Sequence, residues 1–318
     1  MTMQSEPVEQ GGFACSQLSL EAGEPLYGSV NQTHAWFMLE YPRPIGAKAF
    51  ADSALVAPFK TSFSSFVNAI PGSRLLLIKQ SNIVSEEGVT LFVCLSKESA
   101  PVLYEFRAEG YEELLALNFP ALLAQDPLYA GNRRSEPLFL VCTNGRRDAC
   151  CARWGLPLFS ALSAAAPGQV WQSSHVGGHR FAPNLLCFPH GLYYGRVDPA
   201  RAPALLEAYR QGSLDLDFYR GRPAYPAAAQ AGEYFLRKQT GDLGLETYRL
   251  LGVEEAGERV WEVGFAEAGG LRQHRLRLSS RPSGIMAPES CASEGRRMVH
   301  YYHLDLYEEQ EAGEPMLR

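Results

Sequence analysis

The stretch that decides how this chain is interpreted reads CTNGRRDACC at residues 142–151 and continues, after 23 residues, with HVGGH at residues 175–179. Each motif follows a predicted strand: residues 138–142 (LFLVC) form a continuous apolar run, and residues 169–173 form a second short strand. We expect both motifs to form loops, because each glycine of HVGGH disfavours a helix by about 1 kcal/mol. The first motif contains Asn-Gly, which is typical of turns.

Two thiols and two imidazoles make these loops a candidate metal site. Eight residues separate Cys142 from Cys151, and three separate His175 from His179. The histidine spacing suits a Cys2His2 zinc site, but the cysteine gap is about twice the usual upper limit. A 2Fe–2S cluster can also be held by two cysteines and two histidines, although Rieske sequences mix the two residue types within each loop. The pattern leaves zinc and a 2Fe–2S cluster open, and Cys150 is an alternative to Cys151.

The chain has seven cysteines, an odd number, and its N-terminal residues show neither the basic nor the apolar segment of a secretory signal. We therefore expect a cytoplasmic protein without a disulfide framework. The cysteines outside the motif are interpreted as packing residues. They are Cys15, Cys94, Cys187 and Cys291.

Composition narrows the classes of protein that the chain can represent. Its 318 residues suggest two or three domains, and a hydrophobic fraction of 46% argues against a disordered chain. A net charge of -6 argues against a general nucleic-acid binder. There is no apolar run of about 18 residues, so no membrane span is expected. We find no glycine-rich nucleotide-binding fingerprint, so the chain is not expected to carry its own reductase module.

Two parts of the chain share one predicted order of strand, helix, Pro-Gly, strand, strand pair and helix. The first part has predicted strands at 35–41, 74–78, 90–95 and 102–106 and helices at 62–70 and 112–123. The second has strands at 138–142, 169–173, 185–188 and 192–197 and helices at 157–166 and 202–211. A helix at 227–238 and strands at 246–251, 259–265, 271–278 and 298–306 follow.

The expected fold class is α/β to α+β, with an internal duplication. We expect an N-terminal α/β domain at 1–134, a metal-carrying domain at 135–221 and a small antiparallel α+β domain at 222–318. The first domain lacks the ligands of the second. Tyr41 and a proline stand where the second domain has its first cysteine, and QSNIVSEE at 80–87 stands where it has HVGGH.

The sequences CTNGRRDACCARWG at 142–155, SHVGGHRFAPNLL at 174–186 and YGRV at 194–197 resemble the sucrase/ferredoxin-like family. The resemblance is strongest over residues 137–197. It extends more weakly to CSQLSLEAGEPLYGS, which contains Cys15, and to SCAS, which contains Cys291. It implies a thioredoxin-like ferredoxin domain with one 2Fe–2S cluster, preceded by a degenerate thioredoxin-like domain.

The resemblance also implies a ligand set and a function. The cluster motif of the family falls here on Cys142, Cys151, His175 and His179, with Cys150 as the alternative to Cys151. One departure is Asn144, where relatives often carry histidine. The implied function is single-electron transfer with a reductase or oxidase partner protein, rather than conversion of a small-molecule substrate.

Two other hypotheses come from the residues themselves. One is a structural zinc protein that serves as an interaction module. The other is a thiol–disulfide enzyme on a thioredoxin-like scaffold, against which the missing CxxC at the strand-to-helix turn counts.

Overall fold

The structure, a computed structural model, describes residues 15–80, 88–288, 290–291 and 295–311. The strands of the first half are β1 (Ala35–Glu40), β2 (Ser73–Lys79), β3 (Val89–Leu95) and β4 (Val102–Ala108). Those of the second half are β5 (Leu138–Cys142), β6 (Val170–Ser173), β7 (Asn184–Phe188), β8 (Leu192–Gly195) and β9 (Tyr219–Gly221). The C-terminal strands are β10 (Tyr248–Gly257), β11 (Val260–Glu267), β12 (Arg272–Pro288) and β13 (Arg296–Glu311).

Helices connect these strands. The α-helices are α1 (Cys15–Glu21), α2 (Ala57–Asn68), α3 (Phe119–Leu123), α4 (Ala149–Ala165), α5 (Ala202–Arg210) and α6 (Ala227–Thr240). Short 3-10 helices are η1 (Tyr111–Ala116), η2 (Pro127–Asn132) and η3 (His179–Phe181). Among the described residues, no helix combines the length and the apolar character that crossing a bilayer requires.

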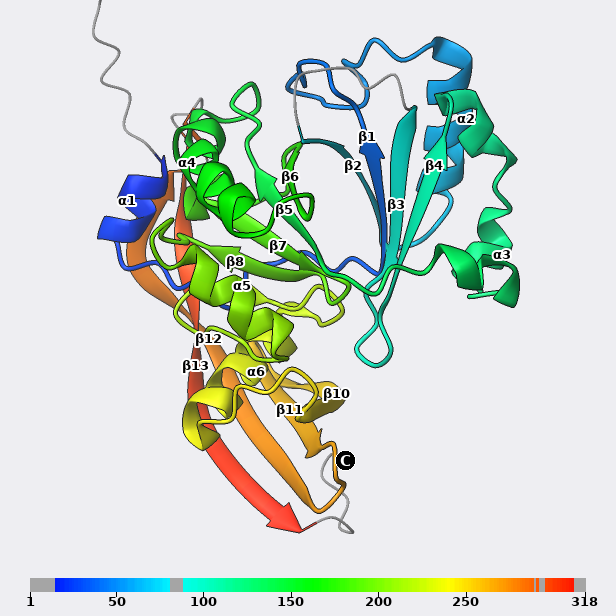
Figure 1. Cartoon of the computed structure of the whole chain (residues 1–318). Coiled ribbons are helices and arrows are strands. Elements are labelled where there is room, and N and C mark those ends of the chain that lie inside the picture. Colours follow the sequence, from blue (N-terminus) through cyan, green and yellow to red (C-terminus); the bar gives the residue numbers. More distant parts are fainter. Residues whose placement is uncertain (1–14, 81–87, 289, 292–294, 312–318) are drawn as a thin grey trace, which may run out of the picture.

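The two halves of the larger sheet repeat one arrangement. The sheet has the order β4-β3-β1-β2-β6-β5-β7-β8-β9 (Figure 1). In the first half β1 is parallel to β2 and antiparallel to β3, which pairs antiparallel with β4. In the second half β5 is parallel to β6 and antiparallel to β7, which pairs antiparallel with β8. A βαβ unit followed by a strand pair in this order is thioredoxin-like, which confirms the expected fold class.

The smaller sheet has the order β10-β11-β12-β13 and is antiparallel throughout, with α6 packed against it. The descent of the two halves from a duplication stays a prediction, as does the division into domains at 1–134, 135–221 and 222–318. Of the segment QSNIVSEE, residues 81–87 lie outside the described residues.

The two halves meet through backbone pairing and a shared aromatic core. Strands β2 and β6 pair antiparallel through two residues each, which makes the sheet continuous. Behind this seam Trp36 contacts Phe188, with ring centroids 5.2 Å apart, and Phe92 contacts Trp171 at 5.5 Å. Figure 1 shows α2 and α3 on the outer side of the first half and α4 and α5 on the outer side of the second. Each half therefore buries one sheet face under helices and the other against its neighbour.

Helix α4 begins eight residues before its predicted start at Pro157, so the prediction of this boundary was wrong. The side chain of Asp148 accepts a hydrogen bond from the backbone N–H of Cys150 and thereby caps the helix. The sequence placed the start at Pro157 because proline is tolerated in the first turn of a helix. Gly155 permits close packing, because a Cβ at this position would lie 2.2 Å from the carbonyl oxygen of Cys142.

Two other predicted helices have different boundaries. Helix α2 begins five residues before the predicted start at Ser62, with a proline in its first turn. The helix predicted over 112–123 is two short helices, η1 and α3. The side chain of Asn118 caps α3 by accepting from the N–H of Ala121, and Pro120 lies in the first turn of α3. Pro120 thus begins a helix rather than interrupting one.

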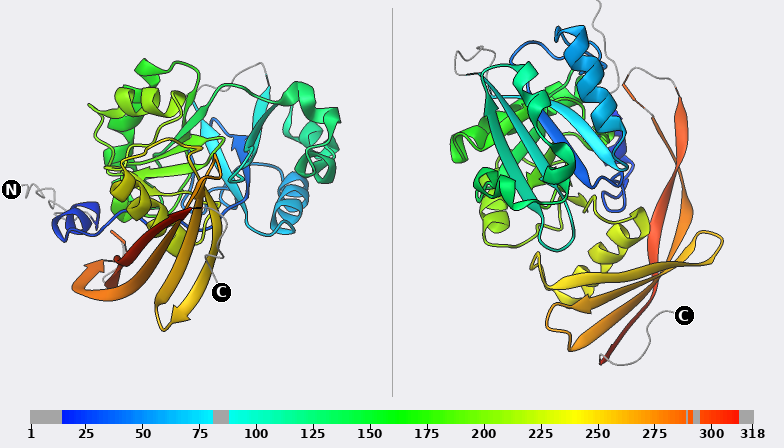
Figure 2. Two further views of the ribbon diagram at one scale, coloured as in Figure 1. Left: turned by 90° about the horizontal axis from the view of Figure 1, so that it is seen from below. Right: turned by 90° about the vertical axis from the view of Figure 1, so that its right-hand side faces the viewer.

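The strands β12 and β13 are much longer than the strands predicted at 271–278 and 298–306. The pairing of the two strands continues past Pro282, with an irregularity between Pro282 and Met286. Figure 2 shows this hairpin running along the side of the molecule. Its far end carries the described residue Cys291 and lies near α1.

A buried ion network joins the larger sheet to the C-terminal part. Glu233 on α6 accepts hydrogen bonds from Arg222, at 3.3 Å, from Arg237, at 2.9 Å, and from the hydroxyl of Tyr219. All four side chains are buried. Burial alone would raise the pKa of Glu233, but the two guanidinium groups and the tyrosine outweigh it and hold the pKa at about 2.

We predict that Glu233→Gln destabilises the fold by about 3–5 kcal/mol, because it leaves two guanidinium groups without their carboxylate in the protein interior. Since the folded pKa of Glu233 is depressed, its stabilisation is complete above the unfolded pKa and is lost as pH falls towards about 2. Chemical denaturation between pH 7 and pH 3 measures both effects. Glu112→Gln, at an exposed position, is the control. A Glu233→Gln protein as stable as this control at pH 7 would contradict the prediction.

Candidate metal centre

The topology brings Cys142, Cys151 and His175 together at one edge of the sheet. Parallel strands β5 and β6 end at the same edge, so the last residue of β5, Cys142, lies beside the loop that follows β6. Helix α4 starts over this edge and supplies Cys151 from its first turn. One ligand atom from each of the three residues lies within 4.8 Å of the other two. We call these three residues the Cys142 group.

The Cys142 group has a buried side and a partly exposed side. Both thiols are buried, whereas the imidazole of His175 is half-buried, with its Nδ1 3.6 Å from the Sγ of Cys151. A hydrogen bond from Cys151 lowers the pKa of Cys142, and His175 and the N–H of Val176 add to this against the opposing effect of burial. The net pKa of Cys142 lies well below its usual value, while the same hydrogen bond and burial raise that of Cys151. The Cys142–Cys151 pair therefore loses its first proton readily, from Cys142, and holds the second on Cys151.

His179 lies next to the Cys142 group but turns one ring nitrogen away from it. Its ring centroid is 5.6 Å from that of His175. Its Nδ1 lies 3.3 Å from Oδ2 of Asp148 and 3.2 Å from the Sγ of Cys15. An Nδ1–H donated to a carboxylate leaves Nε2 as the atom with a free lone pair, which is the usual arrangement of a metal-ligating histidine.

Asp148 lies in the candidate site, although the sequence analysis did not single it out. Besides capping α4, it accepts from the N–H of Cys291 at 3.0 Å. Burial alone would raise the pKa of Asp148, but the N–H of Cys291 and the charge of His179 outweigh this and lower it. The sequence does carry a signal for it, because aspartate is a preferred N-cap residue and Asp148 directly precedes α4.

Two arginines hold the HVGGH loop in place. Arg74 donates to the carbonyl oxygen of His175 at 3.0 Å, and Arg220 donates to that of Gly177 at 3.3 Å and to the side chain of Asn184 at 2.7 Å. Arg220 is fully buried, and burial lowers its pKa to about 9. Gly177 and the following Gly178 have φ of +89° and +69°, which confirms that the loop uses its glycines for positive φ.

The remaining predicted residues divide into those near the site and those elsewhere. Cys150 faces Cys15 and Cys291 rather than the Cys142 group, with sulfur–sulfur distances of 3.5 and 3.1 Å. Cys15 and Cys291, interpreted from the sequence as packing residues, pack with Cys150 in a small cluster that includes Ala182 and Trp154. Contacts between residues this far apart in the chain leave no local signal. Cys94 and Cys187 are buried in the apolar cores, as expected.

The charged and polar residues of the first loop have different positions. Arg146 and Arg147 are exposed beside the site, whereas Arg180 forms an ion pair with Glu24 at 2.7 Å. Asn144 is buried and donates from its side chain to the carbonyl oxygen of Gly46 in the first half. Asn144 thus anchors the loop, and the described contacts give it no place in the Cys142 group.

A model of the sucrase/ferredoxin-like family matches residues 26–221 of the chain. Two curated relatives are named altered inheritance of mitochondria protein 32. The one from Eremothecium gossypii is 31% identical over 117 residues, which cover 32% of this chain and 37% of the relative. The one from Meyerozyma guilliermondii is 31% identical over 99 residues, which cover 27% and 35%. The chain thus spans little more than a third of the length of these relatives.

Solved structures similar to the chain include the thioredoxin-like [2Fe-2S] ferredoxin from Aquifex aeolicus. It is 17% identical, with 29% of this chain and 97% of that chain covered and a TM-score of 0.25. A cysteine-to-serine variant of the same ferredoxin is 19% identical, with 24% and 89% covered and a TM-score of 0.22. Scores this low add nothing to the fold assignment, which rests on the strand order described above.

We predict that Gly178→Ala loosens the histidine loop. A Cβ at this position would lie 2.3 Å from Nη2 of the buried Arg220. Gly168→Ala is a matched control, because Gly168 also has positive φ but has open space around its Cβ position. Both variants place an alanine at positive φ and lose stability for this reason. Gly178→Ala should lose about 1–3 kcal/mol more than Gly168→Ala, because of the clash with Arg220. Denaturant unfolding of both proteins measures the difference, and equal losses would show that Arg220 does not constrain the loop.

Proposed function

Because the chain belongs to the sucrase/ferredoxin-like family, we propose that it binds one 2Fe–2S cluster through Cys142, Cys151, His175 and His179 and exchanges single electrons with a redox partner protein. The observation that carries this proposal is the convergence of two thiols and an imidazole within 4.8 Å, with the second imidazole of the motif adjoining them. These donors come from three separate segments, and the family's motif contains all four.

The donor set suits the proposed group. Iron–sulfur clusters select soft thiolates. In a 2Fe–2S cluster, two imidazoles can replace the two cysteines that bind one of the irons. The low pKa of Cys142 supports a site that readily presents a thiolate. A bound 2Fe–2S cluster supplies one-electron chemistry.

The protein's own residues would orient and tune such a site. The two thiols are buried and the two histidines partly exposed, so the histidine side is the shorter route to a partner protein. Asp148 would fix the ring of His179 through Nδ1. The guanidinium groups of Arg74 and Arg220 lie beneath the histidine loop and would favour the more negative, reduced state.

The partner and the cellular location are part of the proposal. We propose a reductase or oxidase protein as the partner, docking on the side of the exposed Arg146 and Arg147. A partner with an acidic surface would complement these two charges. We also propose a cytoplasmic location, which fractionation of cells that express the tagged full-length protein would test.

We predict that Cys142→Ser or Cys151→Ser abolishes stable cluster binding, while Cys150→Ser retains it. Serine oxygen replaces a thiolate poorly at iron. The measurement is anaerobic purification followed by iron, sulfide and zinc analysis and an absorption spectrum. Cys187→Ala, which removes a buried thiol away from the site, is the control.

Two outcomes would count against this assignment. If Cys150→Ser bleaches the protein and Cys151→Ser does not, Cys150 is the ligand. A colourless wild-type protein that holds zinc at the Cys142 group would replace the electron-transfer proposal with a structural zinc module.

We predict that the reduction potential falls with rising pH, because the reduced form takes up a proton at a histidine ligand more readily than the oxidised form. Replacing His175 or His179 by cysteine should keep a cluster, lower the potential and flatten this dependence. The direction follows from potentials of about −150 to +300 mV for two-histidine centres against about −400 mV for plant-type ferredoxins.

Asp148→Asn sharpens this test. Burial lowers the pKa of His179, and the charge of Asp148 raises it. Removing this charge should lower the pKa further. The reduction potential should then begin to fall at a lower pH than in the wild type. Asparagine can still cap α4. Redox titrations of wild type and the three variants from neutral to alkaline pH decide the matter. A wild-type potential that stays flat over this range, with the cluster intact, would exclude a titrating histidine ligand.

A further inference from the structure

We propose that Cys15, Cys150 and Cys291, together with the carboxylate of Asp148, form a second metal site that takes a zinc ion. We call these four residues the Cys15 group. The site lies beside the Cys142 group and shares no residue with it. The proposal does not depend on whether the neighbouring site holds a 2Fe–2S cluster.

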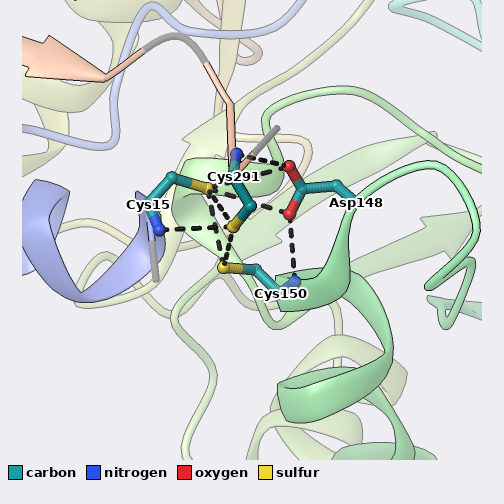
Figure 3. A group of neighbouring side chains, drawn as sticks. All are labelled: Cys15, Asp148, Cys150 and Cys291. Atoms are coloured by element: carbon teal, nitrogen blue, oxygen red, sulfur yellow. Dashed lines mark hydrogen bonds between the residues drawn. The ribbon is translucent and has the colours of Figure 1, made fainter. Parts of the chain in front are cut away.

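The three sulfurs form a closed triangle (Figure 3). The Sγ of Cys150 lies 3.5 Å from that of Cys15 and 3.1 Å from that of Cys291, and the third side measures 3.4 Å. The carboxylate oxygens of Asp148 lie 3.8 and 4.0 Å from the Sγ of Cys15. One ligand atom from each of the four residues lies within 4.8 Å of the others. Four donors around one point are what a tetrahedral zinc site needs.

These residues come from distant parts of the chain. Cys15 begins α1, Cys150 lies in the first turn of α4, and Cys291 lies between β12 and β13. The chain separates Cys15 from Cys150 by 135 positions and from Cys291 by 276. Both ends of the fold thus converge on α4. Packing alone would be served by ordinary apolar side chains at these positions, whereas three thiols meeting at one point is the pattern of thiolate ligation.

Polar groups around the triangle suit negatively charged sulfur. The hydroxyl of Ser16 donates to the Sγ of Cys150 at 3.3 Å, and the backbone N–H of Cys15 donates to the Sγ of Cys291 at 3.4 Å. Nδ1 of His179 lies 3.2 Å from the Sγ of Cys15. Donors of this kind orient metal-bound thiolates and stabilise their charge.

The charge of the pocket favours a cation. The carboxylate of Asp148 is buried beside the three sulfurs, with its oxygens 3.8 and 4.0 Å from the Sγ of Cys15. A zinc ion would displace the thiol protons to solvent, and its two positive charges would partly offset the negative charge of the thiolates and the carboxylate.

The distances favour a metal over a disulfide. Zinc–sulfur bonds of about 2.3 Å in a tetrahedron place the sulfurs about 3.8 Å apart, so the sides of the triangle need to lengthen by about 0.3–0.7 Å. A disulfide needs sulfurs about 2.05 Å apart and would leave the third thiol unpaired. Oδ1 of Asp148 accepts the backbone N–H of Cys150 and keeps a lone pair for the metal, whereas Oδ2 accepts from the N–H of Cys291 and faces Nδ1 of His179.

The tandem cysteines explain how two sites can lie side by side. Neighbouring residues on an α-helix point about 100° apart. Cys150 therefore faces Cys15 and Cys291, while Cys151 faces Cys142 and His175. A metal in the Cys15 group would tie α1 and the β12–β13 hairpin to the same helical turn that supplies Cys151. Its role would be structural, holding these two segments against α4.

The test is the metal content of the full-length chain, purified anaerobically from cells supplied with iron and zinc. We expect about one zinc per chain in the wild type. Cys291→Ser and Cys15→Ser should lose most of this zinc while they keep the iron and the visible spectrum. Cys142→Ser should do the reverse, losing iron and keeping zinc. Cys187→Ala, the control, should keep both metals.

A second measurement covers variants that fold poorly. Cobalt(II) added to metal-free Cys142→Ser protein, in which the neighbouring site is disabled, should give a thiolate-to-cobalt absorption band. Its intensity should fall by at least about one third when Cys291→Ser is added, since one of the three thiolates of the Cys15 group is lost. Equal zinc in wild type and Cys291→Ser would overturn the proposal. So would a disulfide within the Cys15 group in the anaerobic protein, seen as an intact mass two hydrogens lower. A wild type that lacks iron and sulfide, but whose zinc is lost in Cys291→Ser, would overturn the cluster proposal and support this one.

Discussion

The site depends on the contacts that the carboxylate of Asp148 makes with three separate segments of the chain. The carboxylate caps α4 through the N–H of Cys150, holds the C-terminal segment through the N–H of Cys291, and faces Nδ1 of His179. A buried carboxylate is stable only when charge and hydrogen bonds compensate its desolvation, and here all of its partners belong to the site. The start of α4, the ring of His179 and the end of the β12–β13 hairpin are therefore positioned together. Among the described side chains, that of Cys15 also contacts all three, through Cys150, His179 and Cys291.

Much of the fold was predictable because its signals are local. A buried parallel strand is a short apolar run, and LFLVC is such a run. Pro-Gly pairs follow helices where expected, and the repeated pattern predicted the succession of strands and helices along the chain. The start of α4 was not predictable from propensity, because Gly155 and Pro157 argue against a helix there. Tertiary packing decides that boundary: the absence of a Cβ at Gly155 lets the helix approach the carbonyl of Cys142.

The candidate site was predictable only in part, for a related reason. Four of its residues lie in two short motifs whose spacing is visible in the sequence. Cys15 and Cys291 are 276 positions apart, and each stands alone among residues that give no chemical signal. Only the unexpected length of β12 and β13 brings Cys291 to α1. The place of Asp148 in the site was not predictable for another reason: an aspartate between arginines and cysteines is consistent with an ordinary surface turn.

The half without ligands has a physical role in this arrangement. The backbone N–H of Ser174 donates to the carbonyl of Leu77 at 2.8 Å, and the N–H of Leu77 donates to the hydroxyl of Ser174 at 3.1 Å. Arg74, on the same strand β2, donates to the carbonyl of His175. The loop that carries both histidines is thus held from the first half, through the seam between β2 and β6. A thioredoxin-like unit that had lost its own ligands would still be retained, because without it the histidine loop would lose these hydrogen bonds.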